Sequence, residues 1–288
     1  MAAMTFIVHG ATGAQGSPVL SALRAAGHDA VAAVRSTTAA DGPAVAVDYS
    51  SVDSLVAAYE GADGVFVHLP LGTPEQQMQF ARTIAEAVSI ARPARVVFST
   101  SGYALTDLET PSSAPEVLAA ALRAGTVSHA VIEPRVFLEN LLLPVSIGPV
   151  LSEGVLRYPI RDDYAISWSS HLDIADVAAR LLTDTAVDRI VSVGALPALL
   201  GADLAEEFTA YLGRDVRFDA VSPDDYGTLI EPLFGADAVT PVVESYHWRA
   251  TQPGESIPED RSAQKLLGID TRSVRQWLAE MNVERPQS

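Results

Sequence analysis

A glycine-spaced segment near the start of the sequence constrains the fold more than any other feature. Residues 5–9 form a short apolar run, and Gly10, Gly13 and Gly16 follow it at intervals of three. In such a segment the first glycine permits a tight turn, the second lets the backbone approach a phosphate, and the third lets the next helix pack against the strand. The first-turn N–H groups of that helix then face the anion. The segment predicts a strand, a turn and a helix that bind a dinucleotide, although the glycines alone also fit an ordinary tight turn.

The first half of the sequence alternates between short apolar runs and helical stretches. We expect strands at 30–34, 44–47, 64–69, 95–98 and 130–132, and helices at 17–26, 52–59, 74–91 and 115–124. Strands that alternate with helices at this spacing favour right-handed crossovers and a parallel sheet with helices on both faces. The predicted fold class is α/β, a Rossmann-type doubly wound parallel sheet with a smaller α/β C-terminal substrate lobe.

Beyond Pro134 the pattern is less regular. We expect a helical segment at 137–143, strands at 155–158, 164–168 and 190–193, helices at 173–182, 202–212, 223–234 and 271–281, and a further segment at 239–248. Residues 1–150 are interpreted mainly as the cofactor-binding Rossmann domain and residues 151–288 mainly as the C-terminal substrate lobe. No flexible linker separates them, so the lobe is expected to interleave with the sheet in a single structural unit.

Composition excludes several classes of function. The longest apolar run, residues 140–152, is broken by prolines and is too short to cross a bilayer, so no membrane association is expected. A formal net charge of −17 without a basic cluster repels a phosphate backbone, which argues against nucleic acid as a partner. Neither cysteines nor histidines at metal-ligand spacing occur, so no metal is expected. No targeting segment is recognisable, and we expect a cytoplasmic protein.

The identity of the nucleotide depends on Arg35. The expected second strand ends at Val34-Arg35, about twenty residues beyond the last glycine, where NAD-preferring proteins carry an acidic residue that binds the ribose 2′-hydroxyl. The guanidinium of Arg35 suits a 2′-phosphate instead, and residues 36–38 add hydroxyl donors beside it. The predicted cofactor is therefore NADP(H); the alternative is a solvated arginine at a strand end.

Three segments together resemble the NmrA-like group of atypical short-chain dehydrogenase/reductases. They are Gly10–Gly16, the Pro134–Leu142 segment with its Phe-Leu-Glu-Asn-Leu-Leu sequence, and the His171–Ala178 segment, and their order matches over essentially the whole chain. The resemblance implies an NAD(P)H-dependent quinone reductase or another small-molecule reductase. Some members of the group bind NADP as sensors without evident turnover.

The resemblance also implies particular cofactor contacts. Asp48 lies where similar proteins meet the adenine, although it suits equally well as the cap of the following helix. Leu69 and Pro70 would lie under the nicotinamide half by the same analogy, or serve as plain turn residues. The candidate cofactor-binding residues are Gly10, Thr12, Gly13, Ala14, Gln15, Gly16, Arg35, Asp48, Leu69, Pro70, Ser99 and Thr100.

The catalytic pair of the superfamily is missing. Ordinary members use Tyr-x-x-x-Lys, in which the lysine lowers the pKa of the tyrosine that protonates a carbonyl oxygen. The only lysine here is Lys265, with Arg261 four residues before it. Tyr103, in a Ser-Thr-Ser-Gly-Tyr run after the expected fifth strand, is the candidate proton donor; substrate contact and loop packing are its alternatives. Without a neighbouring cation it is a weak acid.

Quinone reduction is compatible with the missing Tyr-x-x-x-Lys pair, because an aromatic hydroquinone anion needs no strong acid to protonate it. The predicted function is an NADPH-dependent oxidoreductase that transfers hydride to a quinone or a conjugated small aromatic substrate. The alternative is an NADP(H)-sensing regulatory protein with a protein partner and no turnover. The candidate substrate contacts are Tyr103, Arg135, Phe137, Asn140 and Trp248. Substrate identity and oligomeric state are left open.

His171 and Asp173 lie near several serines, which raises the question of a hydrolase triad. No Gly-x-Ser-x-Gly elbow accompanies them, so that interpretation is not supported. We interpret Asp173 as the cap of a helix over 174–182 and His171 as a loop residue before it.

Overall fold

The chain forms two units built from interleaved segments. The computed structural model describes residues 4–284. Unit 1 comprises residues 1–134, 171–193 and 258–270, and unit 2 comprises residues 135–170, 194–257 and 271–288. The chain therefore passes from one unit to the other five times, after residues 134, 170, 193, 257 and 270.

Unit 1 contains a seven-stranded sheet in which every neighbouring pair is parallel. Its order is β3-β2-β1-β4-β5-β6-β8. The strands are β1 (Thr5–His9), β2 (Asp29–Val34), β3 (Ala44–Ala46), β4 (Gly64–His68), β5 (Arg95–Ser99), β6 (Ser128–Pro134) and β8 (Ile190–Val193). The order reverses between β1 and β4, and ligands of such sheets bind beyond the carboxyl ends of the strands at that point. The predicted Rossmann-like α/β fold is confirmed.

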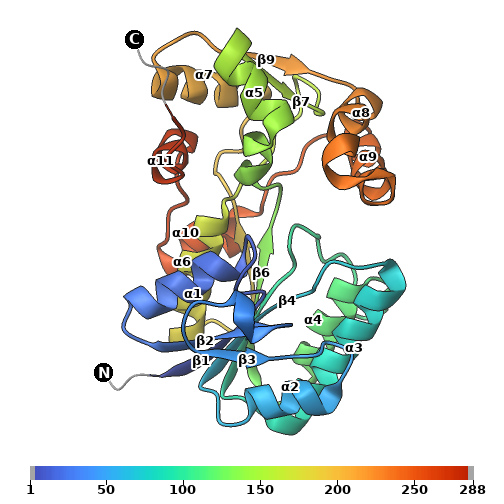
Figure 1. The fold of residues 1–288 in the computed structure, drawn as a ribbon, viewed down its shortest axis with the longest axis vertical. Coiled ribbons are helices and arrows are strands. Elements are labelled where there is room, and N and C mark those ends of the chain that lie inside the picture. Colours follow the sequence, from blue (N-terminus) through green and yellow to red (C-terminus); the bar gives the residue numbers. More distant parts are fainter. Residues whose placement is uncertain (1–3, 285–288) are drawn as a thin grey trace. The chain divides into compact units, whose positions relative to one another are not determined.

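Helices cover both faces of this sheet, which explains why its strands are almost continuously apolar. One layer consists of α1 (Gly16–Ala25), α6 (His171–Thr183) and α10 (Ala263–Leu267), and the other of α2 (Val52–Tyr59), α3 (Pro74–Ala91) and α4 (Ala114–Ala124) (Figure 1). Thr73 and Ser113 start α3 and α4 with capping boxes, each followed by proline in the first turn. Two short 3-10 helices, η1 (Thr37–Ala39) and η3 (Glu259–Arg261), complete the unit.

Unit 2 is mostly helical around a two-stranded parallel ladder of β7 (Val155–Tyr158) and β9 (Arg217–Ala220). Its helices are η2 (Leu138–Leu142), α5 (Pro144–Glu153), α7 (Gly201–Leu212), α8 (Pro223–Phe234), α9 (Ala236–Ala250) and α11 (Val274–Glu280). The helices α8 and α9 pack against each other as a hairpin, and α7 packs against β9 and α11. Tyr158, Trp168 and Trp277 are almost completely buried in this unit, and the rings of Tyr158 and Trp168 are in edge-on contact.

Several expectations for the second half are wrong. Residues 164–168 form no ladder; Ile166 makes only isolated bridges to Leu199 and Glu255. The strand β9 and the helix α5 were not expected. The helix expected to start after Asp173 begins at His171, so Asp173 lies inside its first turn and is not the cap. The N–H groups of a first turn still face this position, which accounts for an acidic residue there.

Searches of the described residues give two negative findings. No helix among them has both the length and the apolar character needed to cross a membrane. Within residues 4–284, nowhere do three or more histidine or acidic side chains gather as metal ligands would.

Candidate functional site

The predicted strand, turn and helix at the glycine segment are present. Gly10 has a φ of 57° directly after β1, and the N–H of Gly13 donates to the carbonyl oxygen of Gly10 at 2.8 Å. A Cβ on Gly16 would lie 2.3 Å from the carbonyl oxygens of both His9 and Gly10, so only glycine fits at the start of α1. Thr12, Gly13 and Ala14 are exposed and the first turn of α1 carries no acidic residue. This glycine turn, residues 10–16, therefore presents backbone N–H groups to an anion.

Gln15 links the glycine turn to the segment that follows β5, residues 99–103, which we call the serine loop. The buried carboxamide of Gln15 accepts a hydrogen bond from Ser99 Oγ at 2.8 Å and donates one to Ser101 Oγ at 3.0 Å. Ser101 and Gly102 both have positive φ, of 58° and 96°. Tyr103 ends the loop and is 54% exposed. The candidate proton donor therefore lies on an irregular segment fixed by side-chain hydrogen bonds.

Two histidines end the central strands of the sheet beside the glycine turn. His9, at the end of β1, lies 2.7 Å through Nε2 from the Tyr59 hydroxyl, and burial lowers the pKa of His9 to about 3. His68, at the end of β4, donates through Nδ1 to the Leu69 carbonyl oxygen at 3.3 Å, and burial also lowers its pKa. A Cβ on Gly10 would lie 2.2 Å from His68 Nε2, so this imidazole packs directly against the turn.

Several polar side chains that burial keeps neutral lie at the carboxyl edge of the sheet. Burial, with a smaller contribution from His68, lowers the pKa of His171 at the start of α6 to about 4. His9 Nδ1, His68 Nε2 and Thr100 Oγ1 are buried polar atoms for which the described part of the chain supplies no partner. Buried polar groups without protein partners are uncommon, and here they fit a ligand rich in donors and acceptors.

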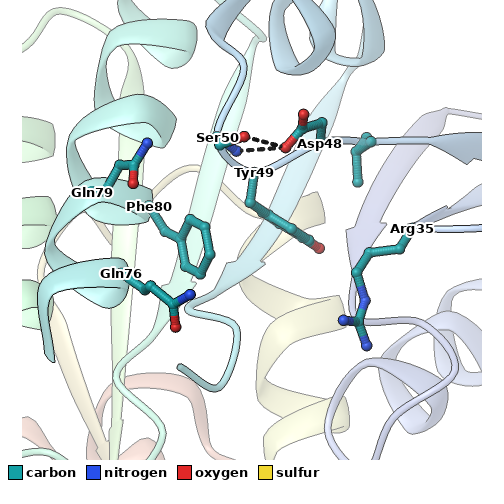
Figure 2. Close-up of a pocket in the computed structure, with 8 residues that line it drawn as sticks. Arg35, Asp48, Tyr49, Ser50, Gln76, Gln79 and Phe80 are labelled. Carbon is teal, nitrogen blue, oxygen red and sulfur yellow. Dashed lines mark hydrogen bonds between the residues drawn. The ribbon is translucent and has the colours of Figure 1, made fainter. Parts of the chain in front are cut away.

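A pocket of about 460 Å³ opens beyond the ends of β2 and β3 (Figure 2). In Figure 2 the Tyr49 ring lies between Phe80 of α3 and Arg35, which follows β2. The Tyr49 and Phe80 ring centroids are 6.0 Å apart. Burial raises the pKa of Tyr49 to about 12, so its hydroxyl stays protonated. The complete lining consists of Arg35, Val47, Asp48, Tyr49, Ser50, Gln76, Gln79 and Phe80.

Arg35 and Asp48 are both exposed at this pocket, but only Asp48 has local hydrogen-bond partners. Asp48 Oδ1 accepts from the backbone N and the Oγ of Ser50, at 2.8 and 2.6 Å, and the side-chain hydrogen bond is the main reason that its pKa lies below the ordinary value. The N-cap of α2 is Ser51, which accepts from the N–H of Ser54, so the capping alternative for Asp48 is wrong. Within residues 4–284, no side chain forms an ion pair with Arg35, and its guanidinium is available to a ligand.

The segment between Tyr103 and α4 is held by two buried carboxylates. Glu116 Oε1 accepts from Thr106 Oγ1 at 2.7 Å and from two backbone N–H groups, while Oε2 accepts from the N–H groups of residues 112 and 113. The Thr106 hydroxyl contributes most to a pKa of Glu116 far below its ordinary value. Glu133 Oε1 accepts from the N–H of Leu105 at 2.8 Å, and its Oε2 pairs with Arg261 at 3.2 Å. The two carboxylates thus fix the segment that connects the serine loop to α4.

Comparison with known proteins identifies the first part of the chain. Residues 10–136 match the model of a family described as NAD(P)H-binding. This part of the chain, which carries the glycine turn and Arg35, is therefore similar to that family. No curated protein matches the sequence.

The whole chain shares its fold with several solved structures. A quinone oxidoreductase of Escherichia coli, described as NADPH-dependent and complexed with NADPH, is 19% identical, with 97% of this chain and 100% of that chain covered and a TM-score of 0.76. A Citrobacter triphenylmethane reductase complexed with NADP(H) is 17% identical, with 96% and 99% covered and a TM-score of 0.77. A Staphylococcus aureus nucleoside-diphosphate-sugar epimerase has the same identity, coverage and TM-score. The predicted resemblance is confirmed for the match of residues 10–136 to an NAD(P)H-binding family and for the fold of the whole chain.

The predicted site residues divide between the two units. All the candidate cofactor residues and Tyr103 belong to unit 1, whereas Arg135, Phe137, Asn140 and Trp248 belong to unit 2. Leu69 is buried directly after β4, and the Pro70 carbonyl accepts from Gln77 at 3.4 Å. Ser99 is completely buried and its hydroxyl donates to Gln15, so it presents no free proton to a cofactor.

The candidate substrate residues of unit 2 have different surroundings. The side chain of Asn140 donates to the Tyr158 hydroxyl at 3.2 Å, within a buried cluster in which Tyr158 also contacts Tyr246 and Tyr226. Arg135 is buried, Phe137 is half-buried and Trp248 on α9 is 55% exposed. Their assignment to the substrate stays a prediction.

The sequence analysis missed several residues of the site. Gln76, Gln79 and Phe80 lie on the exposed start of α3 at intervals of three and four, which places them on one face of a helix. That spacing, directly after the fourth strand, was the available signal. Nothing in the sequence indicated that His9 and His68 pack around the glycine turn.

Proposed function

We propose that this chain is an NADPH-dependent oxidoreductase that transfers hydride to a quinone or a similar conjugated small aromatic substrate. The observation that carries the proposal is an exposed Arg35 without an ion-pair partner among the described residues, at the wall of a pocket in the part of the chain that matches an NAD(P)H-binding family. The fold shared with a protein described as an NADPH-dependent quinone oxidoreductase supports it.

The residues of unit 1 fit an NADP(H) molecule along its length. Arg35 would pair with the 2′-phosphate, and the flat side chains of Tyr49 and Phe80 would flank the adenine. The glycine turn would bind the pyrophosphate through backbone N–H groups. The buried polar atoms of His9, His68 and Thr100 would face the remainder of the ligand. The nicotinamide, when bound, supplies the hydride.

The proton donors available to the reaction are hydroxyl groups. Tyr103 is exposed on the serine loop, and Lys265, the only lysine of the chain, lies exposed on α10. A hydroxyl without a neighbouring ammonium donates a hydrogen bond but is a weak acid. Quinones and activated double bonds are therefore the expected substrates, and simple ketones are expected to react poorly.

A second candidate is an NADP(H)-sensing regulatory protein that binds a protein partner and turns nothing over. The missing catalytic pair favours it, because the only lysine, Lys265, has Arg261 and not a tyrosine four residues before it.

Two measurements separate these candidates. The first follows the loss of NADPH absorbance with a panel of quinones, enones and simple ketones, and the second titrates NADPH and NADH binding. Turnover of quinones supports the oxidoreductase, whereas tight NADPH binding without turnover on any substrate excludes it and favours the sensor. A preference for NADH contradicts the assignment of Arg35.

A further inference from the structure

The side chain of Gln15 has an arrangement that its place in the glycine turn does not indicate. Residues of this turn are expected to face the cofactor, but Gln15 is only 8% exposed. Both ends of its carboxamide are engaged by the serine loop, through Ser99 and Ser101. The side chain is therefore committed to protein partners, and its role differs from that of its exposed neighbours.

The directions of these hydrogen bonds determine where the proton of Ser101 is available. Ser99 Oγ donates to Gln15 Oε1, which leaves Gln15 Nε2 facing Ser101 as a donor. Ser101 Oγ accepts that hydrogen bond, so its own proton is free to be donated elsewhere. In residues 4–284 no group accepts it. The half-exposed hydroxyl of Ser101 can therefore donate one hydrogen bond to another group.

The backbone of the serine loop needs such support. Ser101 has a φ of 58°, a region that side chains other than glycine and asparagine rarely adopt, and Gly102 follows with a φ of 96°. Residues held in such conformations cluster at functional sites and persist where their surroundings fix them. The N–H of Ser101 also donates a hydrogen bond to Ser99 Oγ at 3.4 Å. Ser99 and Gln15 together therefore hold the first residues of the loop in place.

We propose that Gln15 is a positioning residue that orients the hydroxyl of Ser101 toward the ligand bound beside the glycine turn. The inference rests on the proposed function for the identity of that ligand: a quinone or enone oxygen that gains negative charge as hydride arrives. Ser101 donates a hydrogen bond to this oxygen, and Gln15 acts only through Ser101. The same contact joins the dinucleotide-binding turn to the loop that carries Tyr103.

The kinetic test compares Gln15→Met, Ser101→Ala and the double variant. Methionine has nearly the length of glutamine but makes neither hydrogen bond. We expect each single variant to lower kcat about tenfold, which corresponds to the net value of one ordinary hydrogen bond, and to leave the Kd for NADPH within about twofold. The double variant should be no slower than the slower single variant, because the two residues act as one.

Different outcomes overturn the proposal. A tenfold rise in the Kd for NADPH with Gln15→Met would mean that Gln15 contacts the cofactor. Multiplying losses in the double variant would mean that Gln15 and Ser101 act independently. Ser89→Ala, at an exposed serine near the end of α3, is the matched control and should change neither constant.

A second measurement does not need turnover. Hydrogen–deuterium exchange of the amides of residues 100–105 should accelerate about tenfold in Gln15→Met, while exchange in β1 and β4 stays unchanged. If the wild-type protein binds NADPH but reduces no substrate, the proposed function fails and this exchange alone decides the positioning role. Unchanged exchange in the serine loop would overturn that role in either case.

Discussion

The glycine turn follows β1 and the serine loop follows β5, so both lie at the carboxyl edge of the sheet. Their shapes are determined in opposite ways. The glycine turn owes its shape to residues without side chains, and Gly16 leaves no space for a Cβ. The serine loop contains a serine at positive φ, and its shape depends on hydroxyl and carboxamide hydrogen bonds. Under the proposed function, the backbone would provide the binding surface in the glycine turn, and side chains would provide the hydrogen-bond donors in the serine loop. The difference indicates that cofactor binding and turnover can be separated by mutation.

The largest effect is expected at the glycine turn. Gly16→Ala places a Cβ 2.3 Å from two carbonyl oxygens that cannot move without distorting β1. We expect a loss of about 1–3 kcal/mol in the free energy of unfolding, typical of overpacking, and a rise of at least about a hundredfold in the Kd for NADPH. Urea denaturation and fluorescence titration measure the two. Normal binding in Gly16→Ala would show that the turn tolerates a side chain after all.

Arg35→Ala tests the proposed contact with the 2′-phosphate. The guanidinium would form charge-assisted hydrogen bonds with a 2′-phosphate, so its loss should weaken NADPH binding about 10- to 100-fold and leave NADH binding nearly unchanged. Arg189→Ala is the matched control, because Arg189 is exposed just before β8 at the opposite edge of the sheet. Equal weakening of both nucleotides would remove the basis for NADPH preference.

Because the buried His9 lies directly before the glycine turn, the stability of the folded protein should depend on pH. Burial lowers the pKa of His9 to about 3, so below pH 6.5 the unfolded chain binds the proton more readily and the folded state loses stability as the pH falls. Between pH 6.5 and 5 this amounts to about 2 kcal/mol from His9. His9→Gln should reduce the slope of unfolding free energy against pH in that window. An unchanged slope in His9→Gln would contradict the assignment of this pH dependence to His9.

The smallest effect is expected at the end of the serine loop. Tyr103→Phe removes a weak, exposed donor, so kcat with quinones should fall roughly three- to tenfold and the Kd for NADPH should not change. Steady-state kinetics on the same quinone panel checks this. A loss of a thousandfold would mean that Tyr103 is a strong acid despite the missing lysine, and would contradict the separation drawn above.

The first half of the fold was predictable because its strands are continuous apolar runs and its turns carry glycine or a capping serine or threonine. β9 was missed because Arg217, Phe218 and Asp219 mix charge with one aromatic residue and pair with a single short strand. Residues 164–168 looked like a strand because they alternate, but Ile166 finds only isolated backbone partners. An alternating pattern indicates which side chains are buried. In residues 164–168 that burial arises without pairing in a sheet.

The candidate site was predictable where the backbone defines it. Gly10, Gly13 and Gly16 have spacing that predicts a turn directly. The roles of Glu116 and Glu133 were not predictable, because each accepts hydrogen bonds from a loop that only the fold brings to it. Gln15 was expected to face a ligand, and no local pattern could reveal that Ser99 and Ser101 meet its carboxamide.

The interleaving of the two units has a consequence for synthesis on the ribosome. Strands β1 to β6 of the sheet are made by residue 134, but α6, which packs against α1, and the edge strand β8 come only after the residue 135–170 segment of unit 2. A nascent chain of 150 residues therefore carries β6 as an open edge and lacks the helix that covers part of one face. Neither unit is complete before the last crossing, after residue 270. The sheet is therefore finished only when β8 has followed a whole segment of unit 2, and its covering helix α10 comes later still.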